Sequence, residues 1–169
     1  MLTYRRLFEA LNASGCDYVV VGGLAVILHG HARLTTDTDL VVDLAGGRVE
    51  ALLDTLSALG FRPRAPVDLH AFADPVQRQR WIREKGMQVF SVYHASEPRW
   101  VIDLFAEPPI DFAELSARAQ FKELEGVRIR IAAIEDLIAM KKLADREIDR
   151  SDIEHLNQIK DALGDWRAD

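Results

Sequence analysis

The chain has 169 residues, of which 49% are hydrophobic and 28% charged, and its formal net charge at pH 7 is −6. This size suits one domain with a substantial core, and the acidic balance excludes a protein that binds nucleic acid over its whole surface. No apolar run approaches the ~20 residues of a membrane span, and the N-terminus has an amphipathic pattern, unlike a signal peptide. The single cysteine, Cys16, excludes an internal disulfide. We therefore expect a cytoplasmic globular protein without membrane contact.

The first half of the chain predicts an alternation of helices and strands. Apolar residues at helical spacing near the N-terminus predict a helix that ends at Gly15. Residues 18–21 are too few for a helix and β-branched enough for a buried strand. Gly22 and Gly23 separate this strand from a short apolar helix over residues 24–28. A glycine pair at such a turn lets the backbone approach a ligand, with its N–H groups facing an anion.

A second strand, over residues 36–42, carries two carboxylates. Asp37 and Asp39 are two positions apart, so their side chains share one face of the strand and their Cα atoms lie roughly 6.5 Å apart. Two carboxylates on one face can bind a hard cation from one side. The alternative is that these acids cap a turn, but the apolar residues that follow them favour the cation site.

The middle of the chain is harder to interpret. After an amphipathic helix over residues 49–59, residues 61–85 contain three prolines and predict an irregular segment. One interpretation is a solvated loop with a surface helix; the other is a basic wall that meets a polyanion such as tRNA, with Trp81 available for base stacking. The basic residues of this segment are Arg62, Arg64, Arg78, Arg80, Arg83 and Lys85.

A third acid lies in a later apolar strand. Strands are predicted over residues 87–93 and 100–105, and Asp103 is flanked by aliphatic residues in the second of them. An acid in such a strand is costly unless a metal or a hydrogen-bond donor satisfies it, and both alternatives are open. A short helix over residues 112–117 and a hairpin over residues 121–131 are predicted to follow.

Two helices are predicted to close the chain, the first over residues 134–146 and the second beginning at Asp149 or shortly after it. Lys141 lies in the apolar stripe of the first helix, and Asp152 points the same way as the core leucines of the second. Charged residues on buried faces need a reason. Either Lys141 and Arg146 form structural ion pairs with the acids, or Lys141 reaches the phosphates of a nucleotide.

A glycine pair, a short spacer and Asp-x-Asp in an apolar strand together resemble the nucleotidyltransferase superfamily, whose members share the fold of DNA polymerase beta. The match covers residues 18–163, and its details look most like AbiEii-type toxins and uncharacterised bacterial nucleotidyltransferases. The residues that carry the match around the first two strands are Gly22, Gly23, Arg33, Thr36, Asp37 and Asp39.

The resemblance implies an α/β (α+β) nucleotidyltransferase fold, in which helices flank a small mixed β-sheet and a helix pair closes the chain. We expect a single domain over residues 1–169. Residues 1–131 would form the sheet-containing catalytic core, and residues 132–169 would form the C-terminal helices.

The resemblance also assigns roles. The acids implied to be both catalytic and metal-binding are Asp37, Asp39 and Asp103. The residues implied to bind the nucleotide are Gly22, Gly23, Arg33, Thr36 and Lys141. The residues implied to support them are Arg146, Asp149 and Asp152. Ligands that are all oxygen favour Mg²⁺ or Mn²⁺ over zinc, and a pair of such ions would hold the triphosphate and lower the pKa of an acceptor hydroxyl.

The expected function is therefore the metal-dependent transfer of a nucleoside monophosphate from an NTP, such as ATP, to an acceptor hydroxyl. The acceptor is a tRNA, which would bind through residues 62–85, a protein or a small molecule. The protein is a candidate toxin of a toxin–antitoxin pair, with a cognate antitoxin as partner. The alternative is a non-catalytic module of such a pair that binds a nucleotide or a partner, although three acids in apolar strands speak against it.

Overall fold

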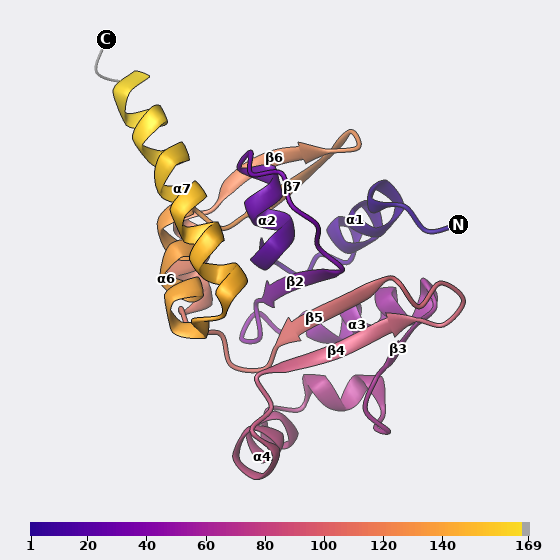
Figure 1. Cartoon of the computed structure of the whole chain (residues 1–169). Coiled ribbons are helices and arrows are strands. Elements are labelled where there is room, and N and C mark those ends of the chain that lie inside the picture. The colour runs from indigo at the N-terminus through magenta and orange to yellow at the C-terminus, as the bar shows by residue number, and fades with distance from the viewer. Residues whose placement is uncertain (167–169) are drawn as a thin grey trace.

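The computed structural model describes residues 1–166, which form one seven-stranded sheet with the strand order β3-β4-β5-β2-β1-β7-β6 (Figure 1). The strands are β1 (Tyr18–Val21), β2 (Asp37–Val42), β3 (Phe61–Pro63), β4 (Val89–His94), β5 (Val101–Phe105), β6 (Gln120–Leu124) and β7 (Val127–Ile131). The helices are α1 (Tyr4–Ala13), α2 (Gly22–Leu28), α3 (Val49–Ala58), η1 (Leu69–Ala73), α4 (Pro75–Lys85), α5 (Phe112–Arg118), α6 (Ile134–Ala144) and α7 (Glu147–Trp166).

The sheet is mixed, which confirms the predicted fold class. Strand β2 pairs antiparallel with β1 and parallel with β5, and β1 pairs parallel with β7. The remaining neighbours, β3–β4, β4–β5 and β6–β7, are antiparallel. Strand β1 is buried along its whole length, as its run of valines predicts. The predicted acidic strand, β2, therefore lies near the middle of the sheet.

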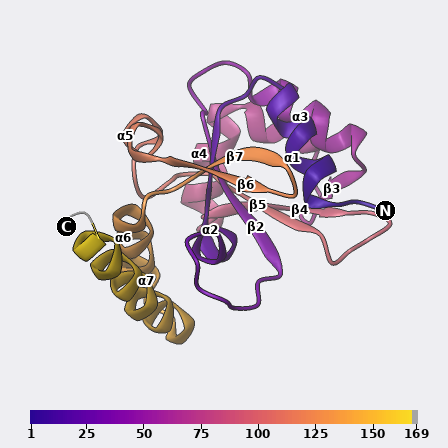
Figure 2. The same ribbon diagram turned by 90° about the horizontal axis from the view of Figure 1, so that it is seen from above.

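Helices cover the two faces of the sheet unequally. Helices α1, α3 and α4 lie against one face, and α2, α6 and α7 lie on the other (Figure 2). On the first face, Phe72 and Trp81 stack on Phe90 of β4, with ring centroids 5.1 Å and 5.5 Å away. On the second face, no helix among residues 1–166 covers the half of the sheet made by β4 and β5.

The alternation of burial along β4 and β5 shows the same asymmetry. The residues of the covered face are fully buried: Phe90, Val92, Ile102 and Leu104. The residues between them are only half-buried: Val89, Ser91, Tyr93, Val101, Asp103 and Phe105. One face of these two strands is thus open, and Asp103 lies on it.

Residues 61–85 are more regular than the sequence predicts. They form β3, η1 and α4, and α4 begins with a helix-start signal, in which Asp74 caps the backbone N–H of Val76 and a proline occupies the first helical position. The prediction that Trp81 is available for base stacking is wrong, because its ring is buried against the sheet. Arg78 is also buried, and its guanidinium donates hydrogen bonds to the carbonyls of Phe72 and Ala73.

Helix α7 begins at Glu147, two residues before the earliest predicted start. This places Asp149 and Asp152 inside the first turns of the helix, where both face α6. No helix among residues 1–166 is both long and apolar enough to cross a membrane.

Candidate active site

The register of the sheet places the predicted acids side by side. Asp39 on β2 is the partner of Asp103 on the parallel strand β5, and Asp103 is in turn the partner of Ser91 on β4. Paired residues on neighbouring strands project from the same face of a sheet, so these three side chains form a row across it. Asp37 lies two positions before Asp39 and shares that face. The predicted acids are therefore brought together on the open side of the sheet.

The glycine turn meets this row. Val21, the last residue of β1, is the register partner of Asp39, and Gly22 follows it. Gly22 has a φ of 63°, in the left-handed region that favours glycine, and the space where its Cβ would lie is taken by the Asp39 carboxylate. Only a residue without a side chain allows this approach. The close contact explains why a glycine at the end of β1 and an acid on β2 occur together.

Within residues 1–166, no ion pair neutralises the acids of the row. Burial, followed by the charges of Asp103 and Asp37, raises the pKa of Asp39 to about 6, although Arg146 and Lys141 oppose the shift. Burial and the charge of Asp37 raise the pKa of Asp103 as well, against a hydrogen bond from Ser91. Accumulated negative charge of this kind is what a bound cation would relieve.

The donor set fits a hard divalent cation. All the candidate ligands are carboxylate oxygens, which Mg²⁺ and Mn²⁺ prefer, and a cation would offset the burial and mutual repulsion that raise the pKa of Asp39. Within residues 1–166, no three His, Cys, Asp or Glu side chains are already gathered into a metal site. The assignment of Asp37, Asp39 and Asp103 as metal ligands remains a prediction.

The predicted phosphate-binding lysine lies in a buried network of ion pairs. The Lys141 ammonium is 3.1 Å from an oxygen of Asp149 and 2.6 Å from one of Asp152. Arg146 reaches Asp149 from the solvent side, at 2.7 Å. The relative exposure of Lys141, Asp149 and Asp152 is only 6%, 0% and 1%. This arrangement has the contacts of the structural ion pair that the sequence offered as one alternative, and it joins α6 to α7.

Arg33 links this network to the glycine turn. One terminal nitrogen of its guanidinium donates to the carboxylate of Asp152, and the other lies 3.2 Å from the position that a Cβ on Gly23 would occupy. His31 approaches the second oxygen of Asp152 at 3.7 Å, and its ring stacks on that of His155 with centroids 3.8 Å apart. The loop between α2 and β2 is thereby held on α7, and Arg33 lies beside Gly23.

Thr36 is the last residue of this loop, immediately before the acidic strand. Its hydroxyl donates a hydrogen bond to the carboxylate of Asp37. The resemblance implied that Thr36 binds the nucleotide, and that role stays a prediction. His29, also near the glycine turn, donates from Nε2 to the carbonyl of Ala132 at 2.8 Å. It serves the fold at the start of the C-terminal helices.

Comparison with known families decides the relationship. Residues 5–163 match the model of a family described as "Nucleotidyltransferase of unknown function (DUF6036)". The chain belongs to this nucleotidyltransferase family. No curated protein matches the sequence. The match covers the acidic strand, the glycine turn and both C-terminal helices.

Several solved structures share the fold of this chain. The lincosamide antibiotic adenylyltransferase LnuA, solved with lincomycin bound, superimposes with a TM-score of 0.61 at 17% identity, over 94% of this chain and 98% of its own. ANT(2'')-Ia in complex with adenylyl-2''-tobramycin gives 0.58 at 16% identity, over 97% and 94%. A nucleotidyltransferase-like protein from Paracoccidioides brasiliensis gives 0.56 at 15% identity, over 94% and 77%. At these identities the likeness establishes the fold alone.

Three residues of this candidate site were missed from the sequence. Ser91 hydrogen-bonds Asp103, Arg64 contributes a positive charge near it, and His31 faces Asp152. Only Ser91 left a usable signal, because it is an isolated polar residue in an apolar strand, as Asp103 is in the next one. The other two lie in loops, and their neighbours are set by the tertiary fold.

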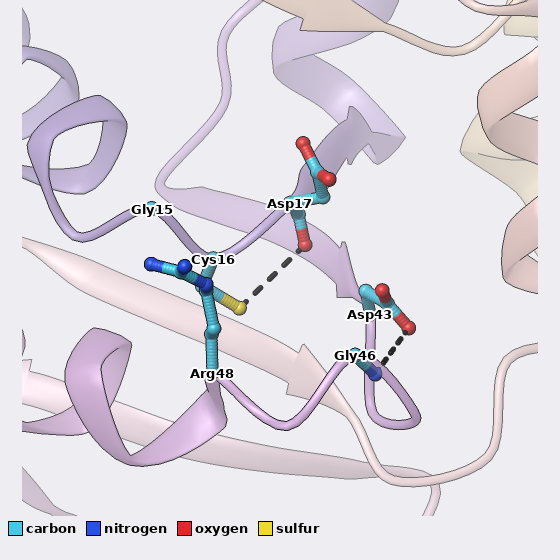
Figure 3. A pocket seen from close by; sticks show the side chains of 6 residues that line it. All are labelled: Gly15, Cys16, Asp17, Asp43, Gly46 and Arg48. Atoms are coloured by element: carbon cyan, nitrogen blue, oxygen red, sulfur yellow. Dashed lines mark hydrogen bonds between the residues drawn. The ribbon is translucent and has the colours of Figure 1, made fainter.

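The other end of the β1–β2 pair carries a small cavity of about 110 Å³ (Figure 3). Asp43, the residue after β2, lies here and accepts hydrogen bonds from the backbone N–H groups of Ala45 and Gly46. Burial raises the pKa of the Cys16 thiol in this cavity to about 11, which keeps the thiol protonated at neutral pH. The cavity is therefore separate from the acidic row, and its cysteine is unreactive.

Proposed function

We propose that this protein transfers a nucleoside monophosphate from an NTP to an acceptor hydroxyl, using Mg²⁺ or Mn²⁺ held by Asp37, Asp39 and Asp103. One observation carries the proposal. Asp39 lies in register with Asp103 and packs over the bare backbone of Gly22, with a pKa raised to about 6. A structural acid has no reason to stay half-buried beside another acid without a cation, whereas a ligand for a divalent ion does.

Each residue of the site has a task in this reaction. A divalent cation bound to the acids would supply positive charge to the triphosphate and lower the pKa of the acceptor hydroxyl. The first N–H groups of α2, at Gly22 and Gly23, have no partner one turn earlier in the helix and point out of its N-terminus, where they can donate to phosphate oxygens. The acceptor oxygen bonds to the α-phosphorus as the bond to pyrophosphate breaks, and the acceptor proton leaves to solvent.

Arg33 and Lys141 would neutralise the departing pyrophosphate. Both cations are paired with Asp152, and this pairing restricts the positions that their side chains can take. In this proposal Asp152, Asp149 and Arg146 act by holding the two cations in place. The buried ion pairs and the phosphate role are thus compatible, because the pairing fixes the position of the charges.

A small-molecule hydroxyl is the acceptor that the site favours. The open face of β4 and β5 places the half-buried side chains of Tyr93 and Phe105 on the same side of the sheet as the acids, where a ring-containing molecule can pack. One protein with this fold is described as a lincosamide antibiotic adenylyltransferase, and another is in complex with adenylyl-2''-tobramycin.

The resemblance to AbiEii-type toxins offers a second acceptor class, tRNA or protein, together with an antitoxin partner. Five basic residues of the segment remain exposed and support a tRNA contact: Arg62, Arg64, Arg80, Arg83 and Lys85. If they contact phosphates, changing Arg83 and Lys85 to Glu should weaken tRNA binding and flatten its dependence on salt by about one unit of slope per lost contact. An unchanged slope would remove tRNA from the proposal.

The decisive experiment is label transfer from each α-³²P NTP in Mg²⁺ to three acceptor sets: total bacterial tRNA, lysate protein, and a panel of hydroxylated antibiotics. The variants are Asp39→Asn and, as a matched control, Asp43→Asn just beyond the other end of the same strand. We expect Asp39→Asn to lose about 10³-fold or more of the activity, several kcal/mol of transition-state stabilisation, and the control to keep it. No transfer with any NTP, together with no Mg²⁺-dependent NTP binding, would leave only the non-catalytic module.

A further inference from the structure

The acidic row ends in a hydroxyl. Ser91, in the middle of β4, donates a hydrogen bond from its Oγ to Oδ1 of Asp103 at 2.5 Å. The two residues are register partners on antiparallel strands, so the contact follows from the pairing of β4 with β5. Among residues 1–166, Ser91 is the only side chain that donates a hydrogen bond to Asp103.

This hydrogen bond restricts a torsion that the backbone leaves free. The last torsion of an aspartate side chain is broad, so strand geometry fixes where the carboxylate lies but not how its plane is turned. A donor on one oxygen selects one orientation and leaves the other oxygen available. In Asp103 the oxygen that the serine leaves available is Oδ2, which lies on the half-buried face of β5 that carries the row.

The serine itself is held firmly. Its carbonyl accepts a hydrogen bond of 2.9 Å from the backbone N–H of Arg64, just beyond β3, while its other side pairs with β5. A donor on a strand paired on both sides is a rigid support, as an oriented ligand requires.

The hydroxyl has no structural task that would explain it otherwise. Val89 and Tyr93, the neighbours of Ser91 on the same face, belong to the residue types that strands favour, and Phe90 and Val92 supply the buried face. Because Ser91 is half-buried, loss of its hydroxyl would cost the fold no more than one net hydrogen bond.

We propose that Ser91 is a positioning residue, which orients the carboxylate of Asp103 so that Oδ2 is free to bind the divalent cation. This inference rests on the proposed function, because the cation is the one that the nucleotidyl transfer requires. It adds to that function a residue outside the three acids, placed on a strand that carries none of them.

The test compares Ser91→Ala with Ser91→Thr, which keeps the hydroxyl, and with Val89→Ala, which trims a side chain on the same face of the same strand. Mn²⁺ affinity is measured by electron paramagnetic resonance without nucleotide, and kcat and KM are measured in the transfer assay. We expect Ser91→Ala to weaken Mn²⁺ binding and lower kcat about tenfold each, the lower end for an outer residue that orients a ligand. The KM for the NTP, the Ser91→Thr variant and the Val89→Ala variant should stay near the wild type.

The outcomes separate the inference from the function on which it rests. Equal Mn²⁺ affinity and kcat in Ser91→Ala and wild type would overturn the positioning role, as would equal losses in Ser91→Ala and Ser91→Thr. If the wild type binds no Mn²⁺, the inference also fails. If the wild type transfers no label but Ser91→Ala still binds Mn²⁺ more weakly, the proposed function fails and the role of Ser91 at the cation site stands.

Discussion

Two groups of aspartates in this protein differ in what neutralises them. On the sheet, burial and the neighbouring acids Asp103 and Asp37 raise the pKa of Asp39 to about 6. Between α6 and α7, burial alone would raise the pKa of Asp149, but hydrogen bonds from Arg146 and Lys141 outweigh it and lower the pKa to about 2. The ionised form of an aspartate is thus disfavoured on the sheet and favoured between the two helices.

The difference indicates that the aspartates between α6 and α7 stabilise the fold, whereas the aspartates on the sheet are available to bind a ligand. Asp149 and Asp152 are compensated within the chain, so their charge stabilises the helix pair and needs no ligand. The acids on the sheet carry a cost that the chain does not offset, and such a cost is commonly retained at sites that bind something. Variants of each group should therefore affect stability in opposite directions.

The largest effect is expected from breaking the compensated group. Asp152→Ala would leave the buried Lys141 and the half-buried Arg33 with fewer partners, and removing one member of a buried charge network costs about 3–5 kcal/mol. We expect this loss in the free energy of unfolding, measured by urea denaturation at pH 7.5. A loss below about 1 kcal/mol would mean that the network does not carry the helix pair, and the contrast between the two regions would fail.

The next largest effect tests the contact between the glycine turn and the acidic row. Gly22→Ala would combine a left-handed φ of 63° with a clash against the Asp39 carboxylate, and we expect a loss of about 3 kcal/mol. Gly47 is a matched control because its φ is 71° but nothing lies within 4 Å of its missing Cβ. Gly47→Ala should cost only the backbone strain, about 1 kcal/mol. Equal losses would show that Asp39 does not press on Gly22.

A smaller effect of opposite sign is expected from the uncompensated group. Asp39→Asn should raise the free energy of unfolding at pH 7.5 by about 1–2 kcal/mol, less than the full pKa shift implies because the site is partly solvated. The carboxyl titrates near 3.8 in the unfolded chain and near 6 in the folded one, so the ionised form destabilises the fold. The gain should grow between these pH values and vanish below pH 4. A gain that persists at pH 3.5 would rule out charge as its origin.

The local parts of this site were predictable from the sequence because each is visible within a few residues. The glycine pair, Asp37, Asp39 and Asp103 stand out as residues that a strand in a core does not need, and the structure brings them to one face. The individual strands, the hairpin and the two closing helices followed from hydrophobic periodicity, and the resemblance supplied their arrangement around a mixed sheet.

The parts that were missed depend on contacts between distant segments. Trp81 is a core residue because it meets Phe90 across the sheet, and nothing near it in the sequence distinguishes that from a stacking platform. Arg33 and Asp152 are 119 residues apart, so the sequence assigned both to the site but not to each other. A surface helix was one interpretation of residues 61–85, but the bounds of α4 were not predicted, although Pro75 marks its start.

The smallest effect sharpens the comparison within α7 itself. Arg150 lies two residues before Asp152 and pairs with Asp145 at 3.2 Å, but the two side chains are 72% and 69% exposed. An exposed pair of this kind loses little water and is screened by salt, so Arg150→Ala should change the free energy of unfolding by less than about 0.5 kcal/mol. Urea denaturation of both variants, Arg150→Ala and Asp152→Ala, gives the ratio of their losses in unfolding free energy directly. If Arg150→Ala costs as much as Asp152→Ala, burial does not decide which charged groups stabilise the fold. The contrast between the compensated aspartates of the helix pair and the uncompensated acids on the sheet would then fail.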